Sequence, residues 1–293
     1  MVQTILVAGA GGQLGRELAG RAPAEVSCLA LGREQFDLTD PDLLSSTLDR
    51  LAPAQVVNAA AYTAVDAAET DVDQAWSANC EGPRNLARAC AEREIRLMHV
   101  STDFVFDGES AHPYAPDASP APLGEYGRSK LAGEQAVMAE CPDVFILRTG
   151  WVYSRFGGNF VKTMLRLMAE RDELSVVCDQ VGTPTWARGL ADALWSASAR
   201  SQLSGIYHWS DAGVCSWYDF AVAIQEEAAA IGLLTRPVQI RPIPASDYPT
   251  PARRPAFSVL DKSRSWRDLG LEGVHWRQQL RAMLTELQER RDA

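Results

Sequence analysis

Residues 4–18 read TILVAGAGGQLGREL, and this stretch decides the fold. A short apolar run leads into three glycines at a regular spacing, Gly9, Gly12 and Gly15, and a helical pattern begins near Gln13. In a strand, turn and helix start of this kind, glycines let the backbone approach a pyrophosphate, and the free amides of the helix start favour its charge. The stretch therefore predicts a dinucleotide-binding turn. A glycine-rich turn without a ligand is the alternative.

The strand–helix alternation continues through the first half of the chain. Further apolar runs are VSCLAL (26–31), QVVN (55–58), IRLMHVST (95–102) and VFILRTGWVY (144–153), with a helix expected over 75–92. Continuous apolar strands separated by helices indicate a parallel sheet that is covered on both faces. We predict an α/β fold with a doubly wound parallel (Rossmann) sheet, in which ligands bind at the carboxyl ends of the strands.

The alternation loosens after Trp151. We expect residues 1–150 to form the dinucleotide-binding Rossmann domain. A smaller C-terminal substrate-binding subdomain is expected from residues 151–171 and 216–293, with parts of 172–215 returning to the sheet.

Helix-start signals support this element pattern. Thr39 or Asp40 is placed to cap a helix with Pro41 at its first position, and Ser216 is placed to cap another. A last helix is expected over residues 275–293.

Composition narrows the functional classes. The 293 residues are 46 % hydrophobic and 23 % charged with a net charge of -10, which argues against a nucleic-acid-binding surface. No apolar run approaches the roughly 20 residues that span a membrane. The six cysteines show no paired spacing and the four histidines are isolated, so we expect no metal site and a reducing, cytoplasmic location. A monomer and a homodimer both remain open.

A hydroxyl, a phenol and an ammonium are expected at one strand end. Thr102 follows an apolar run, and Tyr126 and Lys130 are four residues apart, which places them on one face of a helix. A cation one turn away is expected to lower the pKa of the phenol and make it a usable proton donor. These three groups are what reduction of a carbonyl by hydride requires. A chance Tyr–Lys spacing is the alternative.

The end of the second strand bears on cofactor choice. An acid there binds a ribose hydroxyl, whereas an arginine suits a 2′-phosphate. The chain has Arg33 at this place and no acid directly at the strand end, so we expect NADPH, with NADH possible. Asp37 is a candidate partner for the adenine amino group. Arg33 as a solvated loop residue is the alternative.

The sequence also resembles a known family. The glycine pattern, NAAAYTAVDAAE (58–69), STDFVFDG (101–108), YGRSK (126–130), RTGWVY (148–153), NFVKTML (159–165) and TPARRP (250–255) carry the likeness. These segments resemble the extended short-chain dehydrogenase/reductases and, within that superfamily, the family of dTDP-4-dehydrorhamnose reductases. Members of that family make dTDP-L-rhamnose from the 4-keto sugar. The resemblance covers nearly the whole chain.

The resemblance implies roles for individual residues. The implied catalytic residues are Thr102, Tyr126 and Lys130. The implied cofactor-binding residues are Gly9, Gly12, Gln13, Leu14, Asp37, Leu38, Ala59, Ala60 and Ala61, together with Tyr126 and Lys130. Thr102, Asp103 and Trp151 are implied to contact a nucleotide-sugar substrate.

Related activities are separated by single residues. Sugar-nucleotide dehydratases of the superfamily have an acid directly after the Thr-Asp pair, where this chain has Phe104. Phe104 cannot move a proton, so reduction is favoured over elimination. Epimerases are less clearly separated. A reductase of another nucleotide-linked 4-keto sugar and a non-catalytic, reductase-like regulatory subunit are the two alternatives.

Three further residues are candidate substrate contacts. Arg253 and Arg254 lie in a Pro-rich loop, and guanidinium groups fit phosphate oxygens, so the pair is expected to bind the diphosphate. Surface arginines without a ligand are the alternative. Asn159 has two interpretations, a substrate contact and a helix N-cap.

Some members of the family are thought to dimerise around magnesium held by glutamates. Glu17 lies where one such ligand is expected, but Arg188 follows the segment that would supply another. A guanidinium cannot bind the cation, so we expect no metal here.

Overall fold

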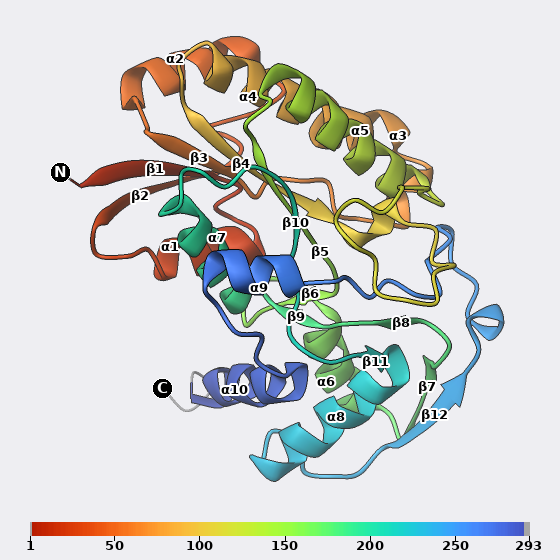
Figure 1. Ribbon diagram of the computed structural model, residues 1–293. Helices are drawn as coiled ribbons and strands as arrows, with labels where there is room; N and C mark the ends of the chain where they lie inside the picture. Colours follow the sequence, from red (N-terminus) through yellow and green to blue (C-terminus); the bar gives the residue numbers. More distant parts are fainter. Residues whose placement is uncertain (1, 290–293) are drawn as a thin grey trace.

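The structure is a computed structural model that describes residues 2–289. Its centre is a six-stranded parallel sheet in the order β10-β5-β4-β3-β1-β2 (Figure 1). The strands are β1 (Gln3–Ala8), β2 (Val26–Leu31), β3 (Gln55–Asn58), β4 (Arg96–Thr102), β5 (Phe145–Thr149) and β10 (Gly205–His208). The predicted doubly wound α/β fold is confirmed.

Helices cover both faces of the sheet, and the alternation of side chains along a strand explains why. Ile5 and Val7 of β1 belong to one apolar core, whereas Leu6 and Ala8 belong to the other. Helices α1 (Gln13–Gly20), α7 (Ala187–Ser198) and α9 (Ser263–Leu269) pack on the first face, and α2 (Pro41–Leu51), α4 (Gly82–Ala91) and α5 (Glu125–Glu140) on the second (Figure 1). The strands between these layers therefore carry apolar side chains toward both faces of the sheet.

The strand order reverses next to β1. The chain runs from β1 to the edge strand β2 and then crosses to β3 on the other side of β1. Ligands of open α/β sheets bind outside the carboxyl ends of the strands at such a reversal. Gly9 follows β1 and Ala59 follows β3, so both lie at this point.

A second lobe lies below the sheet in Figure 1. It contains α6 (Phe160–Glu170), α8 (Trp217–Ala230), α10 (Trp276–Glu289) and a parallel pair of strands, β7 (Glu173–Val177) and β12 (Gln239–Ile243). Shorter pairs are β6 (Val152–Tyr153) with β9 (Thr185–Trp186), and β8 (Val181–Gly182) with β11 (Cys215–Ser216). A separate apolar core includes Val161, Phe220 and Leu280.

Two predicted helix caps are confirmed. The Asp40 carboxylate accepts from the amides of Asp42 and Leu43, with Pro41 at the first position of α2. Ser216 and Asp219 form a reciprocal capping box at the start of α8.

Two predicted elements are each divided in the structure. The strand expected over 144–153 ends at Thr149, because the backbone turns at Trp151 (φ 52°) before β6 begins. The helix expected over 75–92 consists of α3 (Val72–Trp76), one π-helical turn, η2 (Ser77–Glu81), and α4. Pro83 lies at the start of α4, and proline lacks the amide that continues an α-helical ladder. The last four residues of the helix expected over 275–293 lie outside the described residues.

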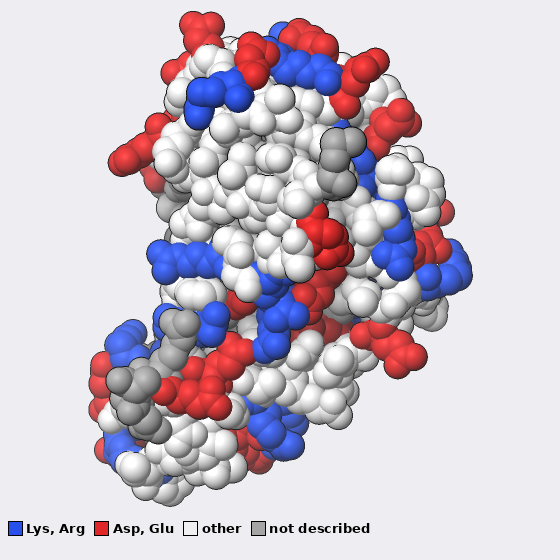
Figure 2. Space-filling model, turned by 90° about the vertical axis from the view of Figure 1, so that its left-hand side faces the viewer, with Lys and Arg blue, Asp and Glu red and all other residues white. Residues whose placement is uncertain are grey.

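Charged groups of both signs mix on the surface. In Figure 2 acidic and basic side chains lie side by side over the lower half, and the centre of the upper half is uncharged. Within residues 2–289, no helix is both long and apolar enough to cross a membrane.

Candidate active site

Thr102, Tyr126 and Lys130 are positioned by two elements. Thr102 is the last residue of β4, and its Oγ1 accepts from the amide of Phe104 (3.2 Å) and donates to Oδ1 of Asp103 (3.1 Å). Tyr126 and Lys130 lie one turn apart on α5. All three side chains are buried.

The Tyr126 phenol is protonated at neutral pH. Its ring packs edge-on against Phe104, with ring centres 5.5 Å apart, and joins an apolar cluster with Ala68 and Ala75. Burial raises the pKa of Tyr126 to about 12; a hydrogen bond with the Thr102 hydroxyl opposes this rise. A donor that keeps its proton throughout the neutral range is therefore available at the end of β4.

The ammonium of Lys130 is held by the backbone. Its Nζ donates to the carbonyl oxygen of Val100 (2.8 Å), and burial lowers the pKa of Lys130 to about 8, although the nearby Glu134 carboxylate opposes this. The expected lowering of the Tyr126 pKa is not seen, because burial outweighs the other influences on the phenol. An ammonium has three donors, so two remain available beside the Val100 bond.

Asp103 is a buried carboxyl group that is hydrogen-bonded to the Thr102 hydroxyl. A Cβ placed on Gly150 would lie 2.4 Å from Oδ2 of Asp103, so only glycine fits there. Burial raises the pKa of Asp103 to about 6, while hydrogen bonds from Ser258 and Thr102 oppose the rise. Asp103 thus joins the end of β4 to a segment of the C-terminal part of the chain.

The glycine turn makes an open cradle at the strand-order reversal. Gly9 has φ +89°, and a Cβ there would lie 2.8 Å from the amide nitrogen of Ala60. A Cβ on Gly15 would lie 2.2 Å from the carbonyl oxygen of Gly9, whereas one on Gly11 would meet nothing within 4 Å. No side chain caps the start of α1 at Gly12. The backbone of this turn therefore fits a pyrophosphate.

Residues next to the turn join the two lobes. Asn159 donates from Nδ2 to Oε1 of Gln13 (2.9 Å), and its Oδ1 accepts from the amide of Lys162 at the start of α6. The N-cap interpretation of Asn159 is therefore confirmed. Its bond to Gln13 also places it beside the glycine turn.

The expected adenosine end of the site contains an ion pair. Nε of Arg33 donates to Oδ2 of Asp37 (3.0 Å), and the Arg33 side chain is 80 % exposed. The other oxygen of Asp37 accepts from the amide and hydroxyl of Thr39. Arg33 is thus at the surface, and within residues 2–289 its guanidinium has a single partner, Asp37.

The other predicted cofactor residues divide into two groups. Ala59, Ala60 and Ala61 follow β3 and are partly or fully exposed, and the amide of Ala60 donates to Oδ1 of Asn58. Leu14 and Leu38 are buried in the two cores of the sheet. Contacts of these leucines with a cofactor would have to come from their backbone.

Trp151 stacks on a residue that sequence reasoning missed. Its ring lies parallel to that of Trp217, with centres 3.4 Å apart and planes inclined by 2°. A Cβ on Gly182 would lie 2.5 Å from the Trp151 ring, so Gly182 also packs closely against it. Trp217 begins α8, 66 positions after Trp151 in the chain, and no local pattern relates the two.

The two candidate phosphate-binding arginines have different environments. Arg254 donates from Nη1 and Nη2 to the two carboxylate oxygens of Asp66 (2.9 and 2.8 Å). Arg253 is exposed. In this structure the Arg254 guanidinium is bound by Asp66 and that of Arg253 is exposed, and the expected contact of the pair with a diphosphate stays a prediction.

The glutamate considered as a metal ligand is buried. Glu17 is 3 % exposed, and its Oε1 accepts from the Ser154 hydroxyl. Arg188 pairs with Glu286. Residues 2–289 contain no group of three His, Cys, Asp or Glu side chains that could hold a metal ion.

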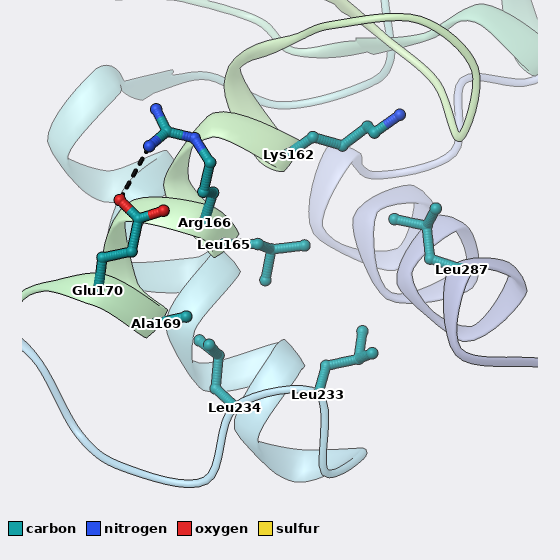
Figure 3. Close-up of a pocket in the computed structure, with 8 residues that line it drawn as sticks. All are labelled: Lys162, Leu165, Arg166, Ala169, Glu170, Leu233, Leu234 and Leu287. Carbon is teal, nitrogen blue, oxygen red and sulfur yellow. Dashed lines mark hydrogen bonds and ion pairs between the residues drawn. The ribbon is translucent and has the colours of Figure 1, made fainter. Parts of the chain in front are cut away.

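A cavity of about 530 Å³ lies away from these groups, in the second lobe. Its lining residues are Lys162, Leu165, Arg166, Ala169, Glu170, Leu233, Leu234 and Leu287. Figure 3 shows Leu165 pointing toward Leu287 across the cavity, with the Arg166–Glu170 ion pair at its rim. None of the predicted catalytic residues lines it, so it is not part of the candidate site.

Comparisons with known proteins agree with this arrangement. The profile of a family described as "RmlD substrate binding domain" matches residues 3–289. The chain is 44 % identical over 283 residues to the dTDP-4-dehydrorhamnose reductase of Burkholderia thailandensis, covering 93 % of this chain and 95 % of that one. It is 42 % identical over 285 residues to a probable dTDP-4,6-dihydroxy-2-methyloxan-3-one 4-ketoreductase of Streptomyces antibioticus, covering 96 % and 95 %.

A solved structure is also similar over the full length. The dTDP-4-dehydrorhamnose reductase of Bacillus anthracis, in complex with NADP, superposes with a TM-score of 0.92 at 35 % identity. The match covers 98 % of this chain and 100 % of that one.

Proposed function

This chain belongs to the RmlD substrate binding domain family, and from that membership we propose that it reduces the C4 keto group of dTDP-4-dehydro-L-rhamnose to give dTDP-L-rhamnose. It is an NAD(P)H-dependent oxidoreductase. The observation that carries the proposal is the contact between the Tyr126 phenol and the Thr102 hydroxyl at the end of β4, the sheet edge on which the glycine cradle also lies.

The proposed reaction divides the work among the chain's own groups. When bound, NADPH supplies the hydride that reduces C4. The backbone of the glycine turn and the uncapped start of α1 hold the pyrophosphate. Thr102 holds the carbonyl oxygen, and Tyr126 donates its proton to that oxygen as negative charge develops there.

Lys130 has a supporting role. With one donor on Val100, its ammonium keeps two donors for the nicotinamide ribose, and its charge favours the phenolate that remains after proton transfer. Its burial keeps this charge close to the reacting atoms instead of screened by water.

Substrate contacts are proposed on the second lobe and at the end of β4. Trp151, held against Trp217, offers a rigid apolar surface to the sugar. Asp103 is proposed to influence substrate binding through Thr102, to which it is hydrogen-bonded. Asn159, which is hydrogen-bonded to Gln13, is proposed as a further substrate contact. Arg33 is proposed to bind the 2′-phosphate of NADPH, since its exposed guanidinium needs to leave only Asp37.

The test is the loss of NADPH absorbance with a panel of nucleotide-linked 4-keto sugars. We expect turnover with dTDP-4-dehydro-L-rhamnose, and a product whose mass and NMR spectrum are those of dTDP-L-rhamnose. Binding of NADPH without turnover of any sugar in the panel would contradict the proposal and favour a regulatory, reductase-like subunit.

A second candidate is supported by the Streptomyces antibioticus relative. Its name denotes reduction of a different dTDP-linked keto sugar, at 42 % identity to this chain. Faster turnover of such a sugar in the same panel would favour this candidate.

A further inference from the structure

Residues 250–258, which we call the strap, connect the second lobe to the sheet. In Figure 1 they belong to the blue chain that leaves β12 and returns to α9. The second half of the strap is fixed by backbone contacts: Ser258 donates its amide to Val181, and Val181 donates to Ala256 (both 2.8 Å). Gly108 (φ +81°) lies so close that a Cβ there would be 2.6 Å from Pro255.

The first half of the strap depends on one carboxylate. Asp66 accepts from the amide of Ala252 (3.2 Å) and from both terminal nitrogens of Arg254 (2.9 and 2.8 Å). Arg254 also donates to Oγ1 of Thr250 (2.6 Å). Among the described residues, every hydrogen bond from 250–254 to the Rossmann half of the chain ends on Asp66.

This contact determines which arginine is available to a ligand. The Arg254 guanidinium is bound through both terminal nitrogens, and its side chain is 25 % exposed. Arg253 is exposed, and within residues 2–289 no ion pair or hydrogen bond engages its side chain. Asp66 therefore holds the Arg254 guanidinium against the Rossmann half of the chain, whereas the preceding residue, Arg253, stays exposed.

The segment that carries Asp66 also reaches the catalytic helix. Three residues later, Oε1 of Glu69 accepts from the amide of Glu125 (2.9 Å), the residue before Tyr126. Val65 and Ala68 pack in the same cluster as the Tyr126 ring. The same segment, residues 65–69, therefore binds the strap through Asp66 and packs against the helix that carries Tyr126.

We propose that Asp66 is a positioning residue: its carboxylate fixes Arg254 and the strap, so that Arg253 alone presents its guanidinium to the diphosphate of the nucleotide sugar. This proposal rests on the proposed function for the identity of the substrate. Asp66 itself touches no substrate, and its effect passes through Arg253.

The first test is a double-mutant cycle. Arg253→Ala is expected to weaken dTDP binding, measured by calorimetry, and to raise the KM for the nucleotide sugar, both by about 10- to 100-fold. Asp66→Asn is expected to have a similar effect, and the double variant an effect no larger than that of Arg253→Ala alone. The KM for NADPH should stay unchanged in all three.

A charge exchange tests the pairing. The double variant with Asp66→Arg and Arg254→Asp keeps an ion pair with its members reversed, and it should recover part of the dTDP affinity lost in Asp66→Asn. Arg166→Ala removes an exposed pair on α6 and is the matched control, with no expected effect on dTDP binding.

The outcomes separate this proposal from the proposed function. Because dTDP binding is measured without turnover, the cycle can be read even in a chain that reduces none of the sugars in the panel. The positioning role would be overturned if the losses of dTDP affinity in Asp66→Asn and Arg253→Ala multiplied in the double variant. An equal loss of NADPH affinity would also overturn it.

Discussion

Replacement of Tyr126 by phenylalanine removes one oxygen atom and little else. The ring is 9 % exposed and packs against Phe104, Ala68 and Ala75, so a phenyl ring fills the same space without a cavity. Thr102 keeps its bonds to Asp103 and to the amide of Phe104. No buried polar group is left without a partner, and the loss of stability should be about 1 kcal/mol, the value of one hydrogen bond.

The kinetic effect of the same change should be much larger. A positioned proton donor contributes about 10²–10⁴-fold in rate, which corresponds to roughly 3–5 kcal/mol of transition-state stabilisation. We expect kcat for reduction of the 4-keto sugar to fall by this factor. The KM for NADPH should change little, because the glycine turn and the start of α1 are untouched.

The assay is NADPH oxidation at saturating sugar, with a thermal unfolding scan of the same preparation. Tyr207→Phe is the matched control, since Tyr207 is also buried and its hydroxyl, on the far side of the sheet, donates to Asp268 and accepts from Arg264. This variant should lose at least as much stability as Tyr126→Phe and keep its kcat. A kcat in Tyr126→Phe equal to that of the unaltered chain would refute the assignment of Tyr126 as the donor.

Four further changes have defined outcomes. Arg33→Ala should raise the KM for NADPH about tenfold in steady-state kinetics and leave the KM for NADH unchanged, since only NADPH carries the 2′-phosphate. Equal changes in both KM values would exclude Arg33 as the residue that binds this phosphate. Because the pKa of Asp103 rises from 3.8 to about 6 on folding, its contribution to stability is fully present below pH 3.8 and is lost as pH rises through 6. In Asp103→Asn the free energy of unfolding, measured with denaturant, should therefore vary less with pH over that window, by up to about 3 kcal/mol. A pH dependence equal to that of the unaltered chain would show that the Asp103 carboxyl group does not cause it. Glu134→Ala leaves the buried Arg148 guanidinium without its bidentate partner and should cost about 3–5 kcal/mol in chemical unfolding, far more than loss of an exposed pair. Trp217→Ala removes the stacked ring of the second lobe and should raise the KM for the sugar with little change in that for NADPH; the reverse pattern would place this stack on the cofactor.

Much of the fold was accessible from local sequence signals. Apolar runs separated by helical patterns predicted the parallel sheet, and the caps at Asp40 and Ser216 were identified from residue type and spacing. These signals work because helix starts and strand periodicity depend on residues within a few positions of each other. The strand break at Trp151 was missed, since the residue adopts a positive φ (52°) that its side-chain type does not predict.

The chemistry of the site was accessible only in part. The sequence by itself determined which groups are present near the strand ends: the glycine turn and the hydroxyl, phenol and ammonium of Thr102, Tyr126 and Lys130. Their electrostatic state came from the tertiary structure: burial raises the pKa of Tyr126, against the expectation from spacing alone, and it also lowers the pKa of Lys130. Burial depends on how distant segments pack, and no local pattern records it.

The partner of Arg254 was likewise decided by the tertiary structure. Two adjacent arginines in a Pro-rich loop are equivalent in sequence, yet one is bound to Asp66, 188 positions away, and the other is exposed. The sequence determined that two guanidinium groups lie side by side in the strap. Only the folded chain decided which one is available to a ligand, because an ion pair forms between groups that are close in space, whatever their separation along the chain.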